Sequence, residues 1–272
     1  MMRAKGLSLH LGGRAILDQV SCTVRPGQVT VVMGQNGAGK STLLQCLAGS
    51  VGADAGAVEV DGQCLAALPP EELAAKRAVL AQSVHLSFPL TVAEVIEMGC
   101  YARYQQWTAR QRTARIDHYL TLLDLQPFRD RSFPTLSGGE QKRVLLAKCL
   151  LQLDADPAAP SGNRYLLLDE PTAALDIGQQ FRFIDLATSL ARKRGLGVFA
   201  VLHDLNLAAR FADEIIFLRD GRVLASGPTH AILTRTTIRD TFDVDCLIQE
   251  HPHYAGPLIT TLPYERPYFA PA

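Results

Sequence analysis

The nine residues GQNGAGKST, from Gly34 to Thr42, decide the fold of this 272-residue chain. They follow the β-branched run VTVVM (29–33), which is typical of a buried parallel strand, and they precede a helix expected from Ser41 to Leu47. The stretch matches the pattern G-x-x-x-x-G-K-[ST] at Gly34, Gly39, Lys40 and Ser41. Its glycines let successive backbone N–H groups turn inward, and the helix amino end adds a favourable dipole, so the stretch predicts a phosphate cradle.

The cradle assigns roles to particular residues. The Lys40 ammonium is expected to reach the β- and γ-phosphates of a bound nucleotide, and the Ser41 hydroxyl is expected to bind Mg²⁺. The residues expected to contact ATP are Gly34, Gln35, Asn36, Gly37, Ala38, Gly39, Lys40, Ser41 and Thr42. A chance glycine loop with an exposed lysine is the alternative, and the strand-to-helix context disfavours it.

The composition is that of an ordinary globular protein, with 47% hydrophobic residues and 27 basic against 27 acidic side chains. A nucleic-acid binder driven by bulk charge is disfavoured. The six cysteines are widely spaced without a zinc or disulfide pattern, which indicates a reducing compartment. Because no signal segment or long apolar run is visible, we expect a cytosolic protein whose membrane role comes through a partner.

Periodicity divides the rest of the chain. Strand-like patterns fill 7–32, GAVEVDGQCL (56–65) predicts a hairpin turning at its Asp-Gly pair, and PPEELAAKRAVLAQ (69–82) predicts a helix. Helical spacing dominates 83–152, which indicates a helical lobe. Strand character returns in RYLLLDEP (164–171) and LGVFAVLHD (196–204), with an amphipathic helix between them, so a parallel sheet is expected.

Three further segments complete this division of the chain. EIIFLRDGRVLASG (214–227) predicts another hairpin. The loop 154–163 and the proline-rich tail from His251 are expected to be unpacked.

Four polar side chains follow predicted strands or precede the lobe. Asp169 ends the run YLLLDE beside the cradle, where it can hold Mg²⁺ through water, and Glu170 can reach an attacking water as general base. His203 ends VFAVLH at the same carboxyl edge of the sheet. Taken alone, two acids after a strand are typical of a solvated turn, and a single histidine is typical of a structural residue. Gln82 by itself does not indicate a function.

A second glycine turn, TLSGGEQKR (135–143), opens onto another helix. Ser137 and the amides of Gly138 and Gly139 form an amino-terminal anion site suited to a γ-phosphate, although Ser137 can equally serve only as a helix cap.

Taken together, these motifs resemble those of the nucleotide-binding subunits of ABC transporters, over nearly the full length to about residue 250. GQNGAGKST is similar to the family's Walker A, YLLLDE to Walker B, LSGGE to the signature, AALD (173–176) to the D-loop, His203 to the switch histidine and Gln82 to the Q-loop glutamine. The resemblance implies an α/β fold: a P-loop NTPase (RecA-like) core with an N-terminal antiparallel β subdomain and an inserted α-helical subdomain.

The resemblance also implies a domain plan. It predicts an ATPase domain over 1–250, with a catalytic core at 1–82 and 153–250, a helical subdomain at 83–152 that carries the signature, and a tail at 251–272. Leu11 stands where many members have an aromatic residue that stacks on adenine, so apolar contact from Leu11 or His10 replaces stacking and adenine selectivity is expected to be weak.

What the resemblance implies for mechanism is a head-to-tail homodimer. Each ATP would lie between one chain's cradle and the partner's signature, so Ser137, Gly138, Gly139 and Asp176 would act in trans. Within one chain, Glu170 would activate water, His203 would contact the γ-phosphate, and Gln82 would sense metal and water. Ser41, Gln82 and Asp169 would be the residues around Mg²⁺.

The resemblance further implies a permease dimer as partner, a position on the cytoplasmic face of the membrane, and, indirectly, a periplasmic or extracellular binding protein. FPLTVAEV (88–95) and the proline-rich insertion before YLLLDE resemble haem importer ATPases, so haem is the expected cargo. Ferric siderophore or cobalamin is the alternative cargo. A non-transport ABC ATPase or a P-loop kinase fits less well, because the former expects tandem cassettes or basic arms and the latter leaves LSGGE unexplained.

Overall fold

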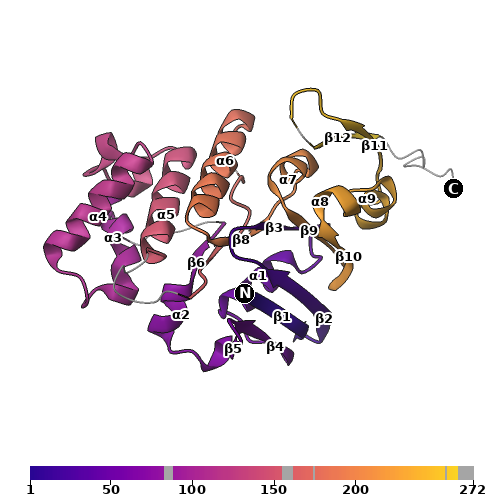
Figure 1. The fold of residues 1–272 in the computed structure, drawn as a ribbon, viewed down its shortest axis with the longest axis horizontal. Helices are drawn as coiled ribbons and strands as arrows, with labels where there is room; N and C mark the ends of the chain where they lie inside the picture. Colours follow the sequence, from indigo (N-terminus) through magenta and orange to yellow (C-terminus); the bar gives the residue numbers. More distant parts are fainter. Residues whose placement is uncertain (83–87, 155–161, 174, 255, 263–272) are drawn as a thin grey trace.

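The computed structural model describes residues 1–82, 88–154, 162–173, 175–254 and 256–262. At its centre is a six-stranded sheet of order β10-β9-β3-β8-β7-β6, in which only β10 runs antiparallel (Figure 1). The strands are β3 (Val29–Met33), β6 (Arg77–Leu80), β7 (Tyr165–Leu168), β8 (Gly197–Val201), β9 (Glu214–Arg219) and β10 (Arg222–Pro228). The predicted parallel sheet is confirmed.

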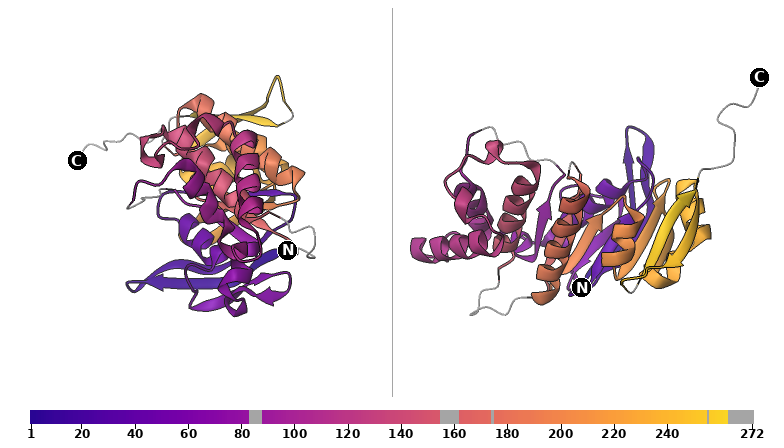
Figure 2. Two further views of the ribbon diagram at one scale, coloured as in Figure 1. Left: turned by 90° about the vertical axis from the view of Figure 1, so that its left-hand side faces the viewer. Right: turned by 90° about the horizontal axis from the view of Figure 1, so that it is seen from above.

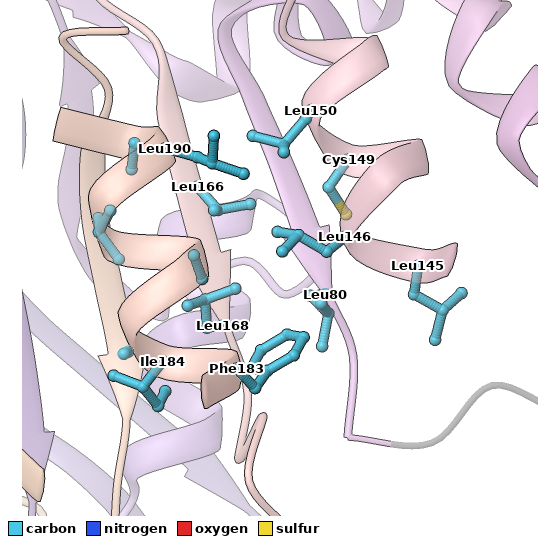
Figure 3. Packing of buried hydrophobic residues seen from close by; sticks show 14 of the residues in the cluster. Leu80, Leu145, Leu146, Cys149, Leu150, Leu166, Leu168, Phe183, Ile184 and Leu190 are labelled. Atoms are coloured by element: carbon cyan, nitrogen blue, oxygen red, sulfur yellow. The ribbon is translucent and has the colours of Figure 1, made fainter. Parts of the chain in front are cut away.

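Both faces of this sheet are covered, which is why its strands read as continuous apolar runs. Successive side chains of β7 enter different cores: Leu166 and Leu168 face α5 (Gly138–Gln152) and α6 (Ile177–Lys193), whereas Tyr165 and Leu167 face the other side. Figure 3 shows apolar side chains of both helices, such as Leu146 of α5 and Phe183 of α6, gathered around the leucines of β6 and β7. The carboxyl ends of β3, β7 and β8 therefore meet at one fixed edge.

A second, antiparallel sheet of order β2-β1-β4-β5 covers the opposite face together with α1 (Lys40–Ala48). Its strands are β1 (Met2–Leu11), β2 (Arg14–Val24), β4 (Ala55–Val60) and β5 (Gln63–Cys64). Asp61 and Gly62 both have positive φ in the β4–β5 turn, as the Asp-Gly pair predicts. The expected N-terminal antiparallel subdomain is confirmed, and so is the β9–β10 hairpin, which turns at Asp220 and Gly221.

The helical lobe lies at one end of the molecule, as the views in Figure 2 agree. It is built from α3 (Val92–Glu97), the 3₁₀ segment Met98–Arg103, α4 (Ala109–Leu122) and α5. Ser137 caps α5 and Thr108 caps α4, each through a capping box. The inserted helical subdomain is thus confirmed, although 83–87 lie outside the described residues.

The helix predicted over 69–82 is wrong in its second half. The helix α2 (Pro70–Lys76) ends before Arg77, and Arg77–Leu80 pairs in parallel with Tyr165–Leu168 as strand β6. Ala78 and Leu80 are buried while Arg77 and Val79 are half-buried. Pairing with the buried strand β7 outweighs the helical propensity of this stretch.

The expectation of an unpacked tail is wrong for 257–262. The chain continues through α7 (Leu205–Phe211), α8 (Thr229–Ile232) and α9 (Arg235–Phe242) into a hairpin of β11 (Asp245–Glu250) and β12 (Pro257–Leu262). Ile259 is buried in the main core, so β12 packs as part of the domain. Residues 263–272, and 155–161 of the expected loop, lie outside the described residues. Among the helices in the described ranges, none is both long and apolar enough to span a bilayer.

Candidate functional site

The predicted cradle joins β3 to α1. Gly37 and Gly39 have φ of 80° and 98°, conformations that favour glycine, and a Cβ on Gly39 would stand 2.7 Å from the Ile16 carbonyl oxygen. Lys40 is only 5% exposed, and its ammonium donates to the carbonyls of Gly34 (3.0 Å) and Gln35 (2.9 Å). Burial lowers the Lys40 pKa, against the opposing effect of the Glu170 and Asp169 carboxylates. The ammonium is thus held inside the loop, where phosphate oxygens would be its anionic partners.

The Ser41 hydroxyl donates to Asp169 Oδ1 at 3.0 Å. Ser41 belongs to the first turn of α1 and Asp169 follows β7, so this bond joins the cradle to the neighbouring strand end. Asp169 is 9% exposed, and burial raises its pKa, although the bond from Ser41 opposes the shift. A hydroxyl and a carboxylate side by side are hard oxygen donors of the kind that Mg²⁺ takes together with phosphate oxygens, so these residues fit that ion.

Glu170 is the centre of a second pair of contacts. Gln82 Nε2 donates to its Oε2 at 2.5 Å, and His203 Nε2 lies 2.7 Å from its Oε1. Glu170 adopts φ of 43°, a left-handed conformation that is rare for residues other than glycine, asparagine and aspartate and that accumulates at functional sites. Two predicted residues from separate loops therefore meet at the carboxylate of a third, beside the cradle.

The second glycine turn has different surroundings. Ser137 caps α5, and both its backbone N–H and its hydroxyl donate to Glu140 Oε2 at 2.8 Å. These bonds lower the Glu140 pKa. Ser137 and Gly138 are exposed, and Gly139 is half-buried beneath Gln179, whose Oε1 would lie 3.0 Å from an added Cβ. Among the described residues, the Ser137 side chain bonds only to Glu140, so the start of α5 lies exposed.

The remaining predicted residues are also placed. Asp176 caps α6 by accepting from the Gln179 N–H at 2.8 Å, while Ala174 of the same motif lies outside the described residues. Leu11 is 55% exposed at the end of β1, and His10 is held by Asp54 at 3.0 Å. Of the cradle residues not yet described, Asn36 is exposed, Ala38 buried and Thr42 half-buried.

Lys142 is a residue that sequence reasoning missed. It is 8% exposed, and its ammonium donates to the Gln82 carbonyl at 2.8 Å. Burial lowers the Lys142 pKa, while the Asp169 and Glu170 carboxylates act in the opposite direction. Lys142 is spaced from Leu145, Leu146 and Cys149 so that it shares the buried face of α5 with them. This spacing is the sequence feature that could have indicated a buried lysine.

Gln35 is hydrogen-bonded to the residue that follows α9. Its Nε2 donates to Asp243 Oδ2 at 2.8 Å, and Asp243 also accepts from Arg219 at 3.1 Å. The sequence separates Gln35 from Asp243 so widely that no spacing argument connects them. The outer side of the cradle is therefore fixed by the residue that follows α9.

Comparison with known proteins agrees with this geometry, because the ABC transporter family model matches residues 17–173. The chain belongs to the ABC transporter family. It is similar to the hemin import ATP-binding proteins HmuV of Bradyrhizobium diazoefficiens (42% identity, covering 92% of this chain and 91% of the relative) and Rhodopseudomonas palustris (44%, covering 89% and 88%). Its activity is that of a transporter ATPase, which couples ATP hydrolysis to transport.

The fold agrees with solved structures as well. The dimeric ATP-binding cassette MJ0796, in a post-hydrolysis state with ADP and Pi, superposes with a TM-score of 0.72 at 28% identity, covering 84% of this chain and 99% of that one. The P-loop core with its antiparallel and helical subdomains is therefore the ATP-binding cassette fold.

Proposed function

We propose that this chain is the ATP-hydrolysing subunit of an importer that carries haem across the cytoplasmic membrane. The observation that carries the ATPase part is the convergence of Gln82 and His203 on Glu170, beside the buried Ser41–Asp169 pair. The cargo is supported by relatives named for hemin import, at 42% and 44% identity over most of both chains.

Catalysis in this scheme begins with water at Glu170. The carboxylate accepts a proton from the water as it attacks the γ-phosphate, and the bond from Gln82 holds the carboxylate in place. His203, which lies beside Glu170, would contact the γ-phosphate, and Lys40 would neutralise the charge that develops on the phosphate oxygens. Asp169, Ser41 and Gln82 would hold Mg²⁺, which would supply charge neutralisation at the phosphates; the Ser41–Asp169 contact supports this assignment.

The site is completed by a second copy of the chain. Ser137, Gly138 and Gly139 offer an exposed helix start, suited to the γ-phosphate held by a partner's cradle, and Asp176 lies at the start of α6 to couple the two sites. ATP closes the homodimer, and hydrolysis releases it. A dimeric cassette among the structural relatives supports this arrangement.

Mixing two inactive variants tests the shared site. A Lys40→Ala chain lacks a working cradle and a Ser137→Arg chain lacks a working signature, so each homodimer should be nearly inactive. The mixed dimer should contain one intact site, formed by the second chain's cradle and the first chain's signature. We expect ATPase activity to reappear on mixing; no recovery, with mixed dimers confirmed by cross-linking, contradicts the shared site.

The permease is proposed to bind a groove of about 640 Å³ on the helical lobe. Glu94, Glu97, Met98, Tyr101 and Tyr104 are among its lining residues. Tyr101 is 67% and Phe88 71% exposed, so neither side chain belongs to the core of the lobe. This groove would place the subunit on the cytoplasmic face of the membrane, with a periplasmic or extracellular binding protein delivering cargo to the permease.

Growth of the source organism tests the cargo. Deletion of the gene should abolish growth on haem as sole iron source and leave growth on ferric siderophore and cobalamin intact. Loss on one of those two alone would assign the alternative cargo. Copurification with ribosomes instead of a multi-spanning membrane protein would favour a non-transport ATPase.

A further inference from the structure

The position of His203 depends on the helix that follows it. Strand β8 ends at Val201 and α7 begins at Leu205, so only the short loop 202–204 carries His203. Asp204 caps α7 by accepting from the N–H groups of Asn206 (2.7 Å) and Leu207 (2.9 Å). Because the loop is short and capped, a shift of α7 moves His203 with it.

Asn206, in the first turn of α7, is bound to the far end of the chain. Its Nδ2 donates to the Ile259 carbonyl at 3.1 Å, and its Oδ1 accepts from the Ile259 N–H at 2.8 Å. Both backbone groups of one residue in β12 are thus satisfied by one side-chain amide, as a neighbouring strand would satisfy them. The two bonds fix the orientation of the amide as well as its distance.

The hairpin that carries Ile259 is itself firmly held. Ile259 pairs with Ile248 of β11, and Cys246 of β11 is fully buried in the main core. Near the hairpin turn, the ring of Tyr254 lies 5.0 Å from the guanidinium of Arg210, in the last turn of α7. The hairpin therefore contacts both the first and the last turn of α7. The helix lies beside the hairpin in Figures 1 and 2.

We propose that the C-terminal hairpin β11–β12 (Asp245–Leu262) is a positioning element for His203, and that Asn206 transmits its hold. The inference rests on the proposed function, because it requires His203 to act on the γ-phosphate. His203 Nε2 lies within hydrogen-bond distance of Glu170 Oε1, at 2.7 Å, and displacement of α7 lengthens that contact. Catalytic geometry is sensitive to such displacements, even those on the order of 1 Å.

The first test is Asn206→Ala in the full-length protein. We expect kcat for ATP hydrolysis to fall about 10-fold while KM changes less than about twofold, because the cradle that binds ATP is unchanged. Asn163→Ala is the matched control, since Asn163 Nδ2 donates to Asp61 Oδ1 at 2.6 Å, next to the β4–β5 turn. A lowered melting temperature with unchanged kcat would show a merely structural role and would overturn the proposal.

Two truncations test the hairpin directly. A chain that ends at Leu262 retains Ile259 and should keep the kcat of the full-length protein. A chain that ends at Glu250 lacks β12 and should lose kcat to the same extent as Asn206→Ala. If the shorter chain does not fold, the full-length Asn206→Ala measurement still decides the question; equal kcat for that variant and the full-length protein would contradict the proposal.

A double-mutant cycle separates this inference from the proposed function. In a His203→Ala background, Asn206→Ala should lower kcat no further, because its effect passes through the missing histidine. Independent, additive losses would overturn the positioning role alone. If His203→Ala itself leaves kcat intact, the role proposed for His203 fails, and the inference fails with it.

Discussion

The cradle at 34–42 and the signature turn at 135–143 are both glycine turns that open onto helices, yet their surroundings differ. Around the cradle, side chains converge from several strand ends: Ser41 binds Asp169, while Gln82 and His203 contact Glu170. Around the signature, the Ser137 side chain bonds only to Glu140 of its own helix among the hydrogen bonds of the described residues.

Their ionisable groups differ in the same way. Burial lowers the pKa of Lys40 and raises that of Asp169, so burial disfavours the charged form of both groups in the cradle. Hydrogen bonds from Ser137 lower the pKa of the half-buried Glu140, so the signature favours its charged carboxylate. The comparison teaches that the cradle brings together groups able to do chemistry, whereas the signature, in the described part of the chain, brings together only a helix cap, which is why we propose that it acts on a partner's nucleotide.

The largest effect is expected at the carboxylate where the cradle's side chains meet. Glu170→Gln removes the proton acceptor and should lower turnover by on the order of 100- to 1000-fold. ATP binding and ATP-dependent dimerisation should persist, because the cradle and signature are unchanged. Steady-state ATPase assays and sedimentation with ATP measure both.

A control for this substitution is Glu59→Gln, at an acid that pairs with Lys5 in the antiparallel sheet at 2.7 Å. That variant should keep full turnover. Full turnover in Glu170→Gln itself would remove the general base from the scheme.

At the signature, the two roles of Ser137 can be separated with aspartate. Aspartate caps helices as well as serine does, but it loses the hydroxyl donor and places a second carboxylate beside Glu140, so Ser137→Asp should lower the melting temperature modestly. Its added charge would face the partner's γ-phosphate and should lower turnover by on the order of 10- to 100-fold.

Thr108→Asp is the matched control, because Thr108 caps α4 through the same kind of capping box. It should keep both stability and turnover. Equal turnover in the two variants would mean that Ser137 is a helix cap and nothing more.

The same comparison explains what the sequence could predict. The cradle, Asp169, Glu170 and His203 were found because each follows a strand in a local pattern, and the strand ends of a parallel sheet meet at one edge. The spacing of Lys142 on α5 indicates that it is buried, but its partner, the Gln82 carbonyl, lies 60 residues earlier, so its contact could not be predicted. The helix cap at Ser137 could be predicted from the local sequence of the signature. Binding of a partner's nucleotide could not, because it depends on a second chain.

Strand β6 and the C-terminal hairpin were missed for a related reason. Arg77–Leu80 follows a good helix start, and only its pairing with β7 makes it a strand. Residues 257–262 looked unpacked because prolines surround them, whereas β11 and Asn206 supply the hydrogen bonds of β12. Contacts between residues far apart in the sequence decide both elements.

A smaller effect should appear in the stability of the cradle. Because the Asp169 pKa is raised, the folded state holds more protons than the unfolded state between the ordinary carboxyl pKa of 3.8 and the raised one. The free energy of unfolding therefore falls as the pH rises through that range. Asp169→Asn removes the ionisation that lowers the free energy of unfolding. At neutral pH and without nucleotide, this variant should be more stable than the unchanged protein by about 1 kcal/mol.

Urea unfolding at several pH values measures the difference, which should shrink towards acid as Asp169 becomes neutral. The asparagine keeps an oxygen that can accept from Ser41, so the bond itself is retained. A variant that is less stable at neutral pH would show that Asp169 stabilises the cradle.

The smallest effect is expected at Glu140. Glutamine can replace glutamate at this position of a capping box, so Glu140→Gln should keep the bonds to Ser137 and the stability of α5. It removes a negative charge from the surface that would receive the partner's triphosphate. We expect the ATP concentration needed for dimerisation to fall by about twofold to threefold at low salt, and the difference to disappear at high salt as the charge is screened. Sedimentation of the hydrolysis-blocked protein across a salt series measures this, and a difference that persists at high salt would locate the effect in the cap rather than in the charge.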